Sequence, residues 1–160
     1  MIEIRRRAKT AIKHFVHLGI SSEDISQLSK YIPKKPFGVE NAHEFLWAVK
    51  SGNFEKVCTM LETNRWLAHV YDDWMQTGLH WAAKRNLASI AELLLKHGAF
   101  IDAPDSSGRT PIYVAAHCNK TATVAVFVKA NANLYRRSKS GKYPLNVTSN
   151  EQITMLLQRL

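Results

Sequence analysis

Residues 77–102, TGLHWAAKRNLASIAELLLKHGAFID, have a counterpart at residues 110–135, TPIYVAAHCNKTATVAVFVKANANLY. Both stretches begin with Thr, carry an aliphatic residue and an Ala-Ala pair at the same distances from it, and close with Lys-x-x-Ala. The offset between them is 33 residues, and Tyr143 and Leu145 continue the same spacing. Internal repetition at this period predicts similar structural units that stack on one another.

Apolar residues recur in each copy at the spacing of amphipathic helices, first around the Ala-Ala pair and again in a Leu- or Val-rich run. Thr77 and Thr110 can cap the first helix of their copies. Gly98 can end a second helix in a left-handed conformation, and Asn131 can do the same one period later. The pattern therefore predicts two helices per unit, with the small Ala pairs where neighbouring units approach closely.

A short polar stretch precedes each unit: DDWMQ at 72, DSSGR at 105 and SKSGK at 138. A period near 33 residues with a core similar to T-P-L-H-x-A resembles the ankyrin repeat, a turn followed by two antiparallel helices. The resemblance implies an all-α solenoid of stacked helix-turn-helix units with short turn or β-hairpin tips. We expect units at about 41–71, 72–104, 105–137 and 138–160.

The first and last units depart from the pattern. The first is offset by 34 residues, so we place one extra residue in the loop around 64–70. The last lacks about four residues, which we expect to be missing between its two helices. We interpret both units as caps whose outer faces meet water.

The second unit differs from the family motif at two positions. Gly78 stands where ankyrin repeats have Pro, and Met75 occupies the turn position at which Gly108 and Gly141 permit a positive φ. We expect the turn of this unit to be strained or differently shaped. His80 is the histidine of the motif, and the resemblance implies that it braces the turn through hydrogen bonds.

Residues 1–40 lie outside the repeats and are predicted to form a basic helical extension with a linker. Apolar residues such as Ile4, Ala8 and Phe15 fall on one helical face, and Gly19 can end that helix. A second helix is expected to follow and to end before PKKPFG, which has the composition of a stiff linker. The extension is therefore predicted to be a helical hairpin.

The net charge of +9 is unevenly distributed. Residues 41–105 carry 6 basic and 8 acidic side chains, whereas residues 106–160 carry 8 basic and 1 acidic side chain. One end of the repeat region is thus strongly positive, which favours acidic partners.

Two further features concern the cellular compartment. No apolar run approaches the roughly 18 residues that a spanning helix needs. Cys58 and Cys118 are too few and too far apart for a disulfide framework, which favours a reducing compartment. We expect a cytoplasmic protein, and a cytoskeletal or ciliary assembly is our hypothesis for its place there.

The sequence offers no motif for catalysis, since HExxH, GxxxxGK[ST] and GxSxG are all absent. His14 and His17 share a predicted helix face, but two imidazoles without a carboxylate or thiolate beside them make a poor metal site. We therefore expect a protein that is not an enzyme and that needs no cofactor or metal.

Protein binding is what the resemblance implies. In ankyrin repeats the turn tips and the exposed side of each first helix form a concave surface that holds partner proteins. We expect Trp74, at a tip, to contribute most, because Trp and Arg dominate interface energies; Trp47, Trp66 and Trp81 are expected in the core. Carried over by position, the surface comprises Lys50, Asp73, Trp74, Gln76, Lys84, Arg85, Ser107, Arg109, His117, Arg136, Arg137, Lys139 and Lys142.

These observations favour a non-catalytic adaptor or structural subunit of a large complex that binds an acidic protein surface or tail. One alternative is nucleic-acid binding by the basic C-terminal third, although this strip lacks interleaved aromatic residues. Another is peripheral membrane attachment through residues 1–18, whose basic amphipathic pattern is weakened by Glu3.

Overall fold

The computed structural model describes residues 39–158, and the predicted helical hairpin and linker of the N-terminal extension lie outside this range. No helix among the described residues is long and apolar enough to cross a membrane. The elements are α3 (Val39–Ser51), α4 (Phe54–Thr63), η1 (Arg65–His69), α5 (Gly78–Arg85), α6 (Ala88–Lys96), α7 (Pro111–His117), α8 (Thr121–Lys129), η2 (Pro144–Asn146) and α9 (Glu151–Gln158), where η denotes a 3-10 helix.

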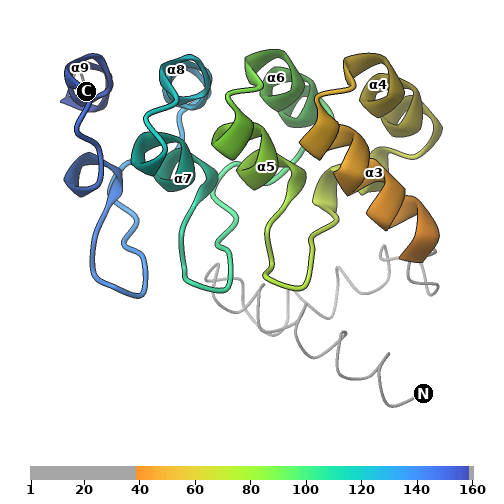
Figure 1. Ribbon diagram of the computed structural model, residues 1–160, viewed down its shortest axis with the longest axis horizontal. Coiled ribbons are helices and arrows are strands. Elements are labelled where there is room, and N and C mark those ends of the chain that lie inside the picture. The colour runs from red at the N-terminus through yellow and green to blue at the C-terminus, as the bar shows by residue number, and fades with distance from the viewer. Residues whose placement is uncertain (1–38, 159–160) are drawn as a thin grey trace. The chain divides into compact units, whose positions relative to one another are not determined.

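The helices form four layers that lie side by side (Figure 1). The layers consist of α3 with α4, α5 with α6, α7 with α8, and η2 with α9. Helix α5 packs between α3 and α7, and α6 packs between α4 and α8, so each inner layer contacts only its two neighbours. The all-α stack predicted from the repeat is confirmed. Strand-like pairing in the described range is an isolated antiparallel bridge between Tyr71 and Thr77.

The core runs through all layers as one continuous cluster. The Ala-Ala pairs of α5 and α7 are completely buried, as expected for the points where successive layers meet. Large side chains such as Phe45, Leu94 and Phe127 fill the space between the first and second helices and are also completely buried. Burial of such side chains stabilises each layer by contact with the next, because one helix pair cannot cover its own apolar face.

The predicted helix ends are present. The Thr110 hydroxyl accepts a hydrogen bond from the N–H of Tyr113 at the start of α7. Gly98 and Asn131 follow α6 and α8 in the left-handed conformation, with φ of 83° and 60°. Short η1 occupies the loop in which the extra residue of the first unit was expected. These local signals therefore act as the sequence indicates.

The prediction for the last unit was wrong in one respect. The missing residues come out of its first helix, which is reduced to the single turn η2. Asn146 ends that turn by folding back, since its side-chain oxygen accepts the N–H of Tyr143 at 3.2 Å. Asn150 then caps α9 by accepting the N–H of Ile153 at 3.1 Å. Two capping side chains this close together leave no room for a full helix between them.

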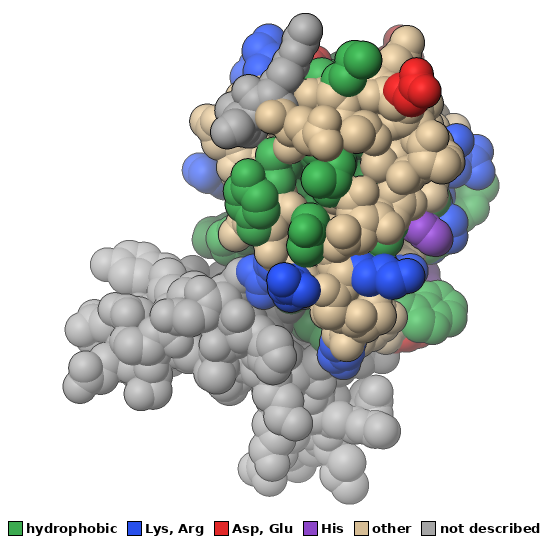
Figure 2. Space-filling view, turned by 90° about the vertical axis from the view of Figure 1, so that its left-hand side faces the viewer, with side chains coloured by type: hydrophobic (Ala, Val, Ile, Leu, Met, Phe, Trp, Pro, Cys, Tyr) green, Lys and Arg blue, Asp and Glu red, His purple; other side chains and the backbone are tan. Residues whose placement is uncertain are grey.

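The outer face of the fourth layer is also less polar than a cap was expected to be. Leu145 is half-exposed, whereas Ile112, one period earlier, is completely buried by the next layer. Met155 on α9 is 62% exposed. Figure 2 shows hydrophobic side chains gathered in the middle of this face, with Lys and Arg side chains below them on the side of the hairpin tips.

Two of the three tryptophans expected in the core are at the surface. Trp47 is 65% exposed and Trp66 is 42% exposed, while Trp81 is half-buried. Trp47 lies on α3 between Leu46 and Ala48, both of which face the neighbouring helices and are buried. Helix α3 belongs to the first layer, so its opposite side has no further described helix to pack against.

Candidate protein-binding surface

Three hairpin tips project from the same side of the stack (Figure 1). We call them tip two (residues 72–76), tip three (105–109) and tip four (138–142). In each tip the first residue donates its N–H to the carbonyl of the fifth, and the fourth donates to the carbonyl of the first, over distances of 2.8 to 3.1 Å. The three tips therefore share one backbone design.

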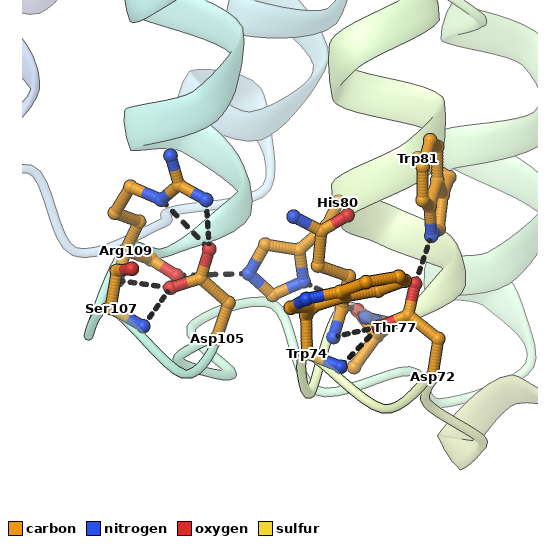
Figure 3. Close-up of polar contacts among 9 residues, drawn as sticks. Asp72, Trp74, Thr77, His80, Trp81, Asp105, Ser107 and Arg109 are labelled. Atoms are coloured by element: carbon orange, nitrogen blue, oxygen red, sulfur yellow. Dashed lines mark hydrogen bonds and ion pairs between the residues drawn. The ribbon is translucent and has the colours of Figure 1, made fainter.

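An aspartate holds the backbone of tips two and three (Figure 3). Asp72 Oδ1 accepts the N–H groups of Trp74 and Gln76, at 3.0 and 2.9 Å. Asp105 Oδ1 accepts the corresponding N–H groups of Ser107 and Arg109, at 2.8 and 2.9 Å. Such turns of Asp side chain onto following N–H groups fix the loop without help from a partner.

The fourth residue of each tip has a positive φ. The angle is 58° at Met75, 73° at Gly108 and 76° at Gly141. Tip two thus has the same shape as the others, and the two possibilities left open by the sequence resolve in favour of strain. The left-handed region costs a residue with a Cβ about 1 kcal/mol or more.

Replacing Met75 by Gly should remove this strain. We expect the free energy of unfolding to rise by about 0.5 kcal/mol, because the relief of about 1 kcal/mol is partly offset by the greater flexibility of Gly in the unfolded chain. The reciprocal change, Gly141→Met, should lower stability by about 1 kcal/mol. Nothing lies within 4 Å of a Cβ placed on Gly141, so a steric clash does not complicate the control. Urea unfolding measures both; a stabilising Gly141→Met would refute the strain.

Adjacent tips are joined by backbone hydrogen bonds. The Ser106 N–H donates to the carbonyl of Trp74, and the Lys139 N–H donates to the carbonyl of Ser107, both at 2.9 Å. The tips therefore form a continuous edge, and the side chains that they present are held at fixed positions along it.

His80 ties the second layer to tip three (Figure 3). Its Nδ1 accepts the backbone N–H of Thr77 at 3.1 Å, so the ring proton is on Nε2, which donates to the Arg109 carbonyl at 2.9 Å. The ring is almost completely buried. Burial lowers the pKa of His80 from 6.5 to about 4, although the hydrogen bond to the Arg109 carbonyl opposes this shift. His80 is thus a neutral brace, the role implied by the resemblance.

Two aromatic rings mark the surface of the second layer. Trp74 lies at the end of tip two and is 63% exposed. Trp81 on α5 donates its Nε1–H to Asp72 Oδ2 at 2.9 Å. Lys50 and Lys84 place their ammonium groups 4.0 and 5.0 Å from the centre of the Trp81 ring. These contacts join tip two to the last turns of α3 and α5, and bring three of the predicted residues together around one ring.

The positive charge of the predicted surface is weaker than the sequence suggests. Arg109 forms an ion pair with the buried Asp105 carboxylate, with Nη2 at 2.7 Å and Nε at 2.8 Å from Oδ2. Lys50 Nζ lies 3.9 Å from Asp72 Oδ2. Both cations are therefore compensated locally, and the side chains left to supply the excess charge are Lys84, Arg85, Arg137, Lys139 and Lys142.

The remaining predicted residues occupy three places. Asp73 and Ser107 are exposed on tips two and three, and Gln76 is half-exposed at the base of tip two. His117 is exposed in the last turn of α7. Arg136 and Arg137 lead into tip four, where Arg137 donates to the Gly141 carbonyl at 2.9 Å and lies 5.3 Å from the Tyr143 ring.

Tyr113 was missed by the sequence reasoning. It stands 33 residues after His80 and so occupies the position of the brace in the third layer. It lines an open depression of about 520 Å³ between tips three and four. The repeat alignment carries the signal, because a bulky phenol in place of the imidazole changes what the brace can bond.

The described part of the chain contains no group of three or more His, Cys, Asp or Glu side chains placed to hold a metal ion. His14 and His17, the pair weighed as a metal site, lie outside the described residues.

Comparison with known proteins finds that residues 45–138 match the family model described as ankyrin repeats, in three copies. An interferon antagonist, OPG039, of monkeypox virus is 32% identical over 102 residues, which is 63% of this chain and 35% of the viral protein. Inversin-B of Xenopus laevis is 39% identical over 56 residues, 34% of this chain and 6% of its own length. Rabankyrin-5 of Mus musculus is 34% identical over 70 residues, 43% of this chain and 6% of its own length. The chain thus covers only a minor part of each relative.

Proposed function

Because the chain belongs to the ankyrin-repeat family, whose repeats are non-catalytic modules for protein–protein interaction, we propose that it is an adaptor or scaffold subunit that binds an acidic protein partner. The partner segment would lie across tips two to four and the exposed side of α5 and α7. The proposal includes a place in a larger assembly of the cytoplasm, of cytoskeletal or ciliary kind.

The observation that carries the proposal is the exposed Trp74 ring at the end of a rigid tip. The backbone N–H of Trp74 is held by Asp72, and its carbonyl is held by tip three. A large ring that is already positioned loses little conformational freedom when a partner covers it, so its burial contributes strongly to affinity.

Charge supports an acidic partner. Past Asp105, Glu151 is the one acidic residue, whereas tip four alone contributes Lys139 and Lys142 and is preceded by Arg137. These side chains lie at the surface and are not needed to neutralise a neighbouring carboxylate among the described residues. Such a one-sided distribution speeds capture of an acidic segment and makes binding sensitive to salt.

Crosslinking mass spectrometry on the native complex identifies the partner chain that lies opposite Trp74 and tip four. The proposal requires crosslinks from Lys139 or Lys142 to an acidic segment of another protein. Crosslinks confined to other parts of the surface would contradict it.

Trp74→Ala should weaken binding of the partner so identified by roughly 30-fold, since a central interface Trp contributes about 2 kcal/mol. Trp47→Ala is the matched control, because Trp47 is exposed to the same extent but lies on α3 away from the tips; its affinity should stay within about twofold. Adding Arg137→Ala to Trp74→Ala should reduce the salt dependence of binding, measured by calorimetry at several ionic strengths. Equal losses for the two Trp variants would reject the tip surface.

Nucleic acid is the alternative outcome that tip four invites. Filter binding to RNA and to duplex DNA at physiological salt tests it. Binding of either polymer that is lost in Lys139→Gln would replace the protein partner in this proposal, whereas its absence leaves the acidic protein as the partner class.

A further inference from the structure

The third layer lacks the brace that the second layer has. His80 donates to the Arg109 carbonyl of tip three, but Tyr113, in the same position, makes no side-chain hydrogen bond to tip four or to any other described residue. The corresponding carbonyl, that of Lys142, instead accepts from the Ser138 hydroxyl at 3.1 Å. The Tyr113 hydroxyl is consequently unpaired, although the residue is only 6% exposed.

A depression opens where the brace is missing. It has a volume of about 520 Å³ and is lined by Ser106, Ser107, Arg109, Tyr113, Ser138, Lys139 and Ser140. The Tyr113 hydroxyl is not among the fully buried polar atoms that lack a partner, so it reaches solvent on this side. A nearly buried polar side chain is thus aimed into a cavity without a partner of its own.

The free groups around the depression are donors. The hydroxyls of Ser106, Ser107 and Tyr113 make no hydrogen bond with the described residues. Lys139 contributes an exposed ammonium, and Arg109 retains Nη1 after Asp105 has bound Nε and Nη2. By contrast, both oxygens of the neighbouring Asp105 carboxylate are already occupied by N–H groups.

The backbone amides of the tips do not contribute. The Ser106 and Lys139 N–H groups bind the adjacent tips, and the Ser107 N–H binds Asp105. A ligand must therefore be recognised by side-chain hydroxyls and two cations, around a rim fixed by the hydrogen bonds between tips. Such a set of five donors matches an anion with three terminal oxygens better than a carboxylate with two.

We propose that the depression between tips three and four receives the phosphate of a phosphorylated serine or threonine side chain in the protein partner. This inference rests on the proposed function, since the depression lies on the partner-binding surface. It adds a specific anchor and makes binding dependent on phosphorylation of the partner.

The test uses a short acetylated Gly- and Ala-based peptide with one central phosphoserine, together with the same peptide carrying Ser or Glu at that position. Calorimetry at physiological salt should give at least about tenfold tighter binding for phosphoserine than for either other peptide. Amide NMR shifts should concentrate at Ser107, Lys139 and Ser140. Equal affinity for the Ser or Glu peptide would overturn the proposal, as would shifts elsewhere on the protein.

Inorganic phosphate is titrated separately to distinguish a protein ligand from a free ion. It should bind the same residues but at least about tenfold more weakly than the phosphopeptide, because it gains no contacts from a peptide backbone. Inorganic phosphate that binds as tightly as the phosphopeptide would overturn the assignment to a protein side chain.

Two variants test the individual donors. Tyr113→Phe should lower phosphopeptide affinity by about fivefold while leaving the unfolding midpoint unchanged, because the hydroxyl has no partner to lose. Tyr135→Phe is the matched control, since Tyr135 is exposed outside the depression. Lys139→Gln should lower affinity by about tenfold, and Lys129→Gln, at the end of α8, should not. Unchanged affinity in both Tyr113→Phe and Lys139→Gln would overturn the proposal.

The two proposals fail in different ways. If the crosslinked partner still requires Trp74 but binds equally well after phosphatase treatment, the phosphate site is wrong and the adaptor function stands. If Trp74→Ala has no effect on partner binding, the proposed partner surface is wrong whatever the phosphopeptide does.

Discussion

His80→Ala is expected to lower the free energy of unfolding by about 3 kcal/mol and the thermal midpoint by roughly 10 °C. The substitution removes a fully buried ring from the contact between α5 and tip three. It leaves the Thr77 N–H and the Arg109 carbonyl without their partners, and it opens a cavity between two layers. Each of these effects is destabilising, and they add at one site.

Urea unfolding followed by circular dichroism measures the change. His117→Ala is the control, because His117 is exposed in the last turn of α7 and its removal should cost less than about 0.5 kcal/mol. His80→Gln should fall between the two, since an amide can still accept one hydrogen bond and donate another. A His80→Ala protein as stable as the His117→Ala protein would show that the imidazole does not hold the layers together.

The second large effect concerns pH. The folded chain holds the pKa of His80 at about 4, whereas the unfolded chain has the ordinary value of 6.5. Between these values the unfolded state binds a proton that the folded state rejects, so the stabilising contribution is complete above pH 6.5 and is lost as the pH falls toward 4. The full loss amounts to about 3 kcal/mol.

The effect is isolated by comparison with His80→Gln, which does not titrate. Between pH 7 and pH 5 the natural protein should lose about 2 kcal/mol more of its unfolding free energy than the variant. The burial that lowers the pKa of His69 acts in both proteins and cancels in the difference. Parallel pH profiles for the two proteins would mean that His80 is protonated in the folded state.

Much of the fold could be predicted because the repeat makes each signal visible more than once. Thr110, Gly98 and Asn131 perform the capping roles that their positions indicate, and His80 forms the expected brace. Hydrogen bonds of this kind depend on residues close in sequence and on a backbone that the period already specifies. Local chemistry is therefore sufficient to locate them.

The errors arise where the outcome depends on neighbours that periodicity does not identify. Trp47 has the helical spacing of a core residue, but no described helix covers its side of the first layer. Arg109 reads as a surface cation, yet its guanidinium turns back to Asp105 within the same tip. Tyr113 needed the comparison with His80, position against position, before its unpaired hydroxyl acquired a meaning.

The backbone bonds that link successive tips also set a ruler. Each tip contributes two adjoining strands, and neighbouring strands lie about 4.8 Å apart, so the pattern advances by about 10 Å from one tip to the next. An extended polypeptide covers about 3.3 Å per residue. A ligand lying along this edge therefore meets equivalent positions at every third residue, and its sequence should carry a matching triplet spacing of anchors.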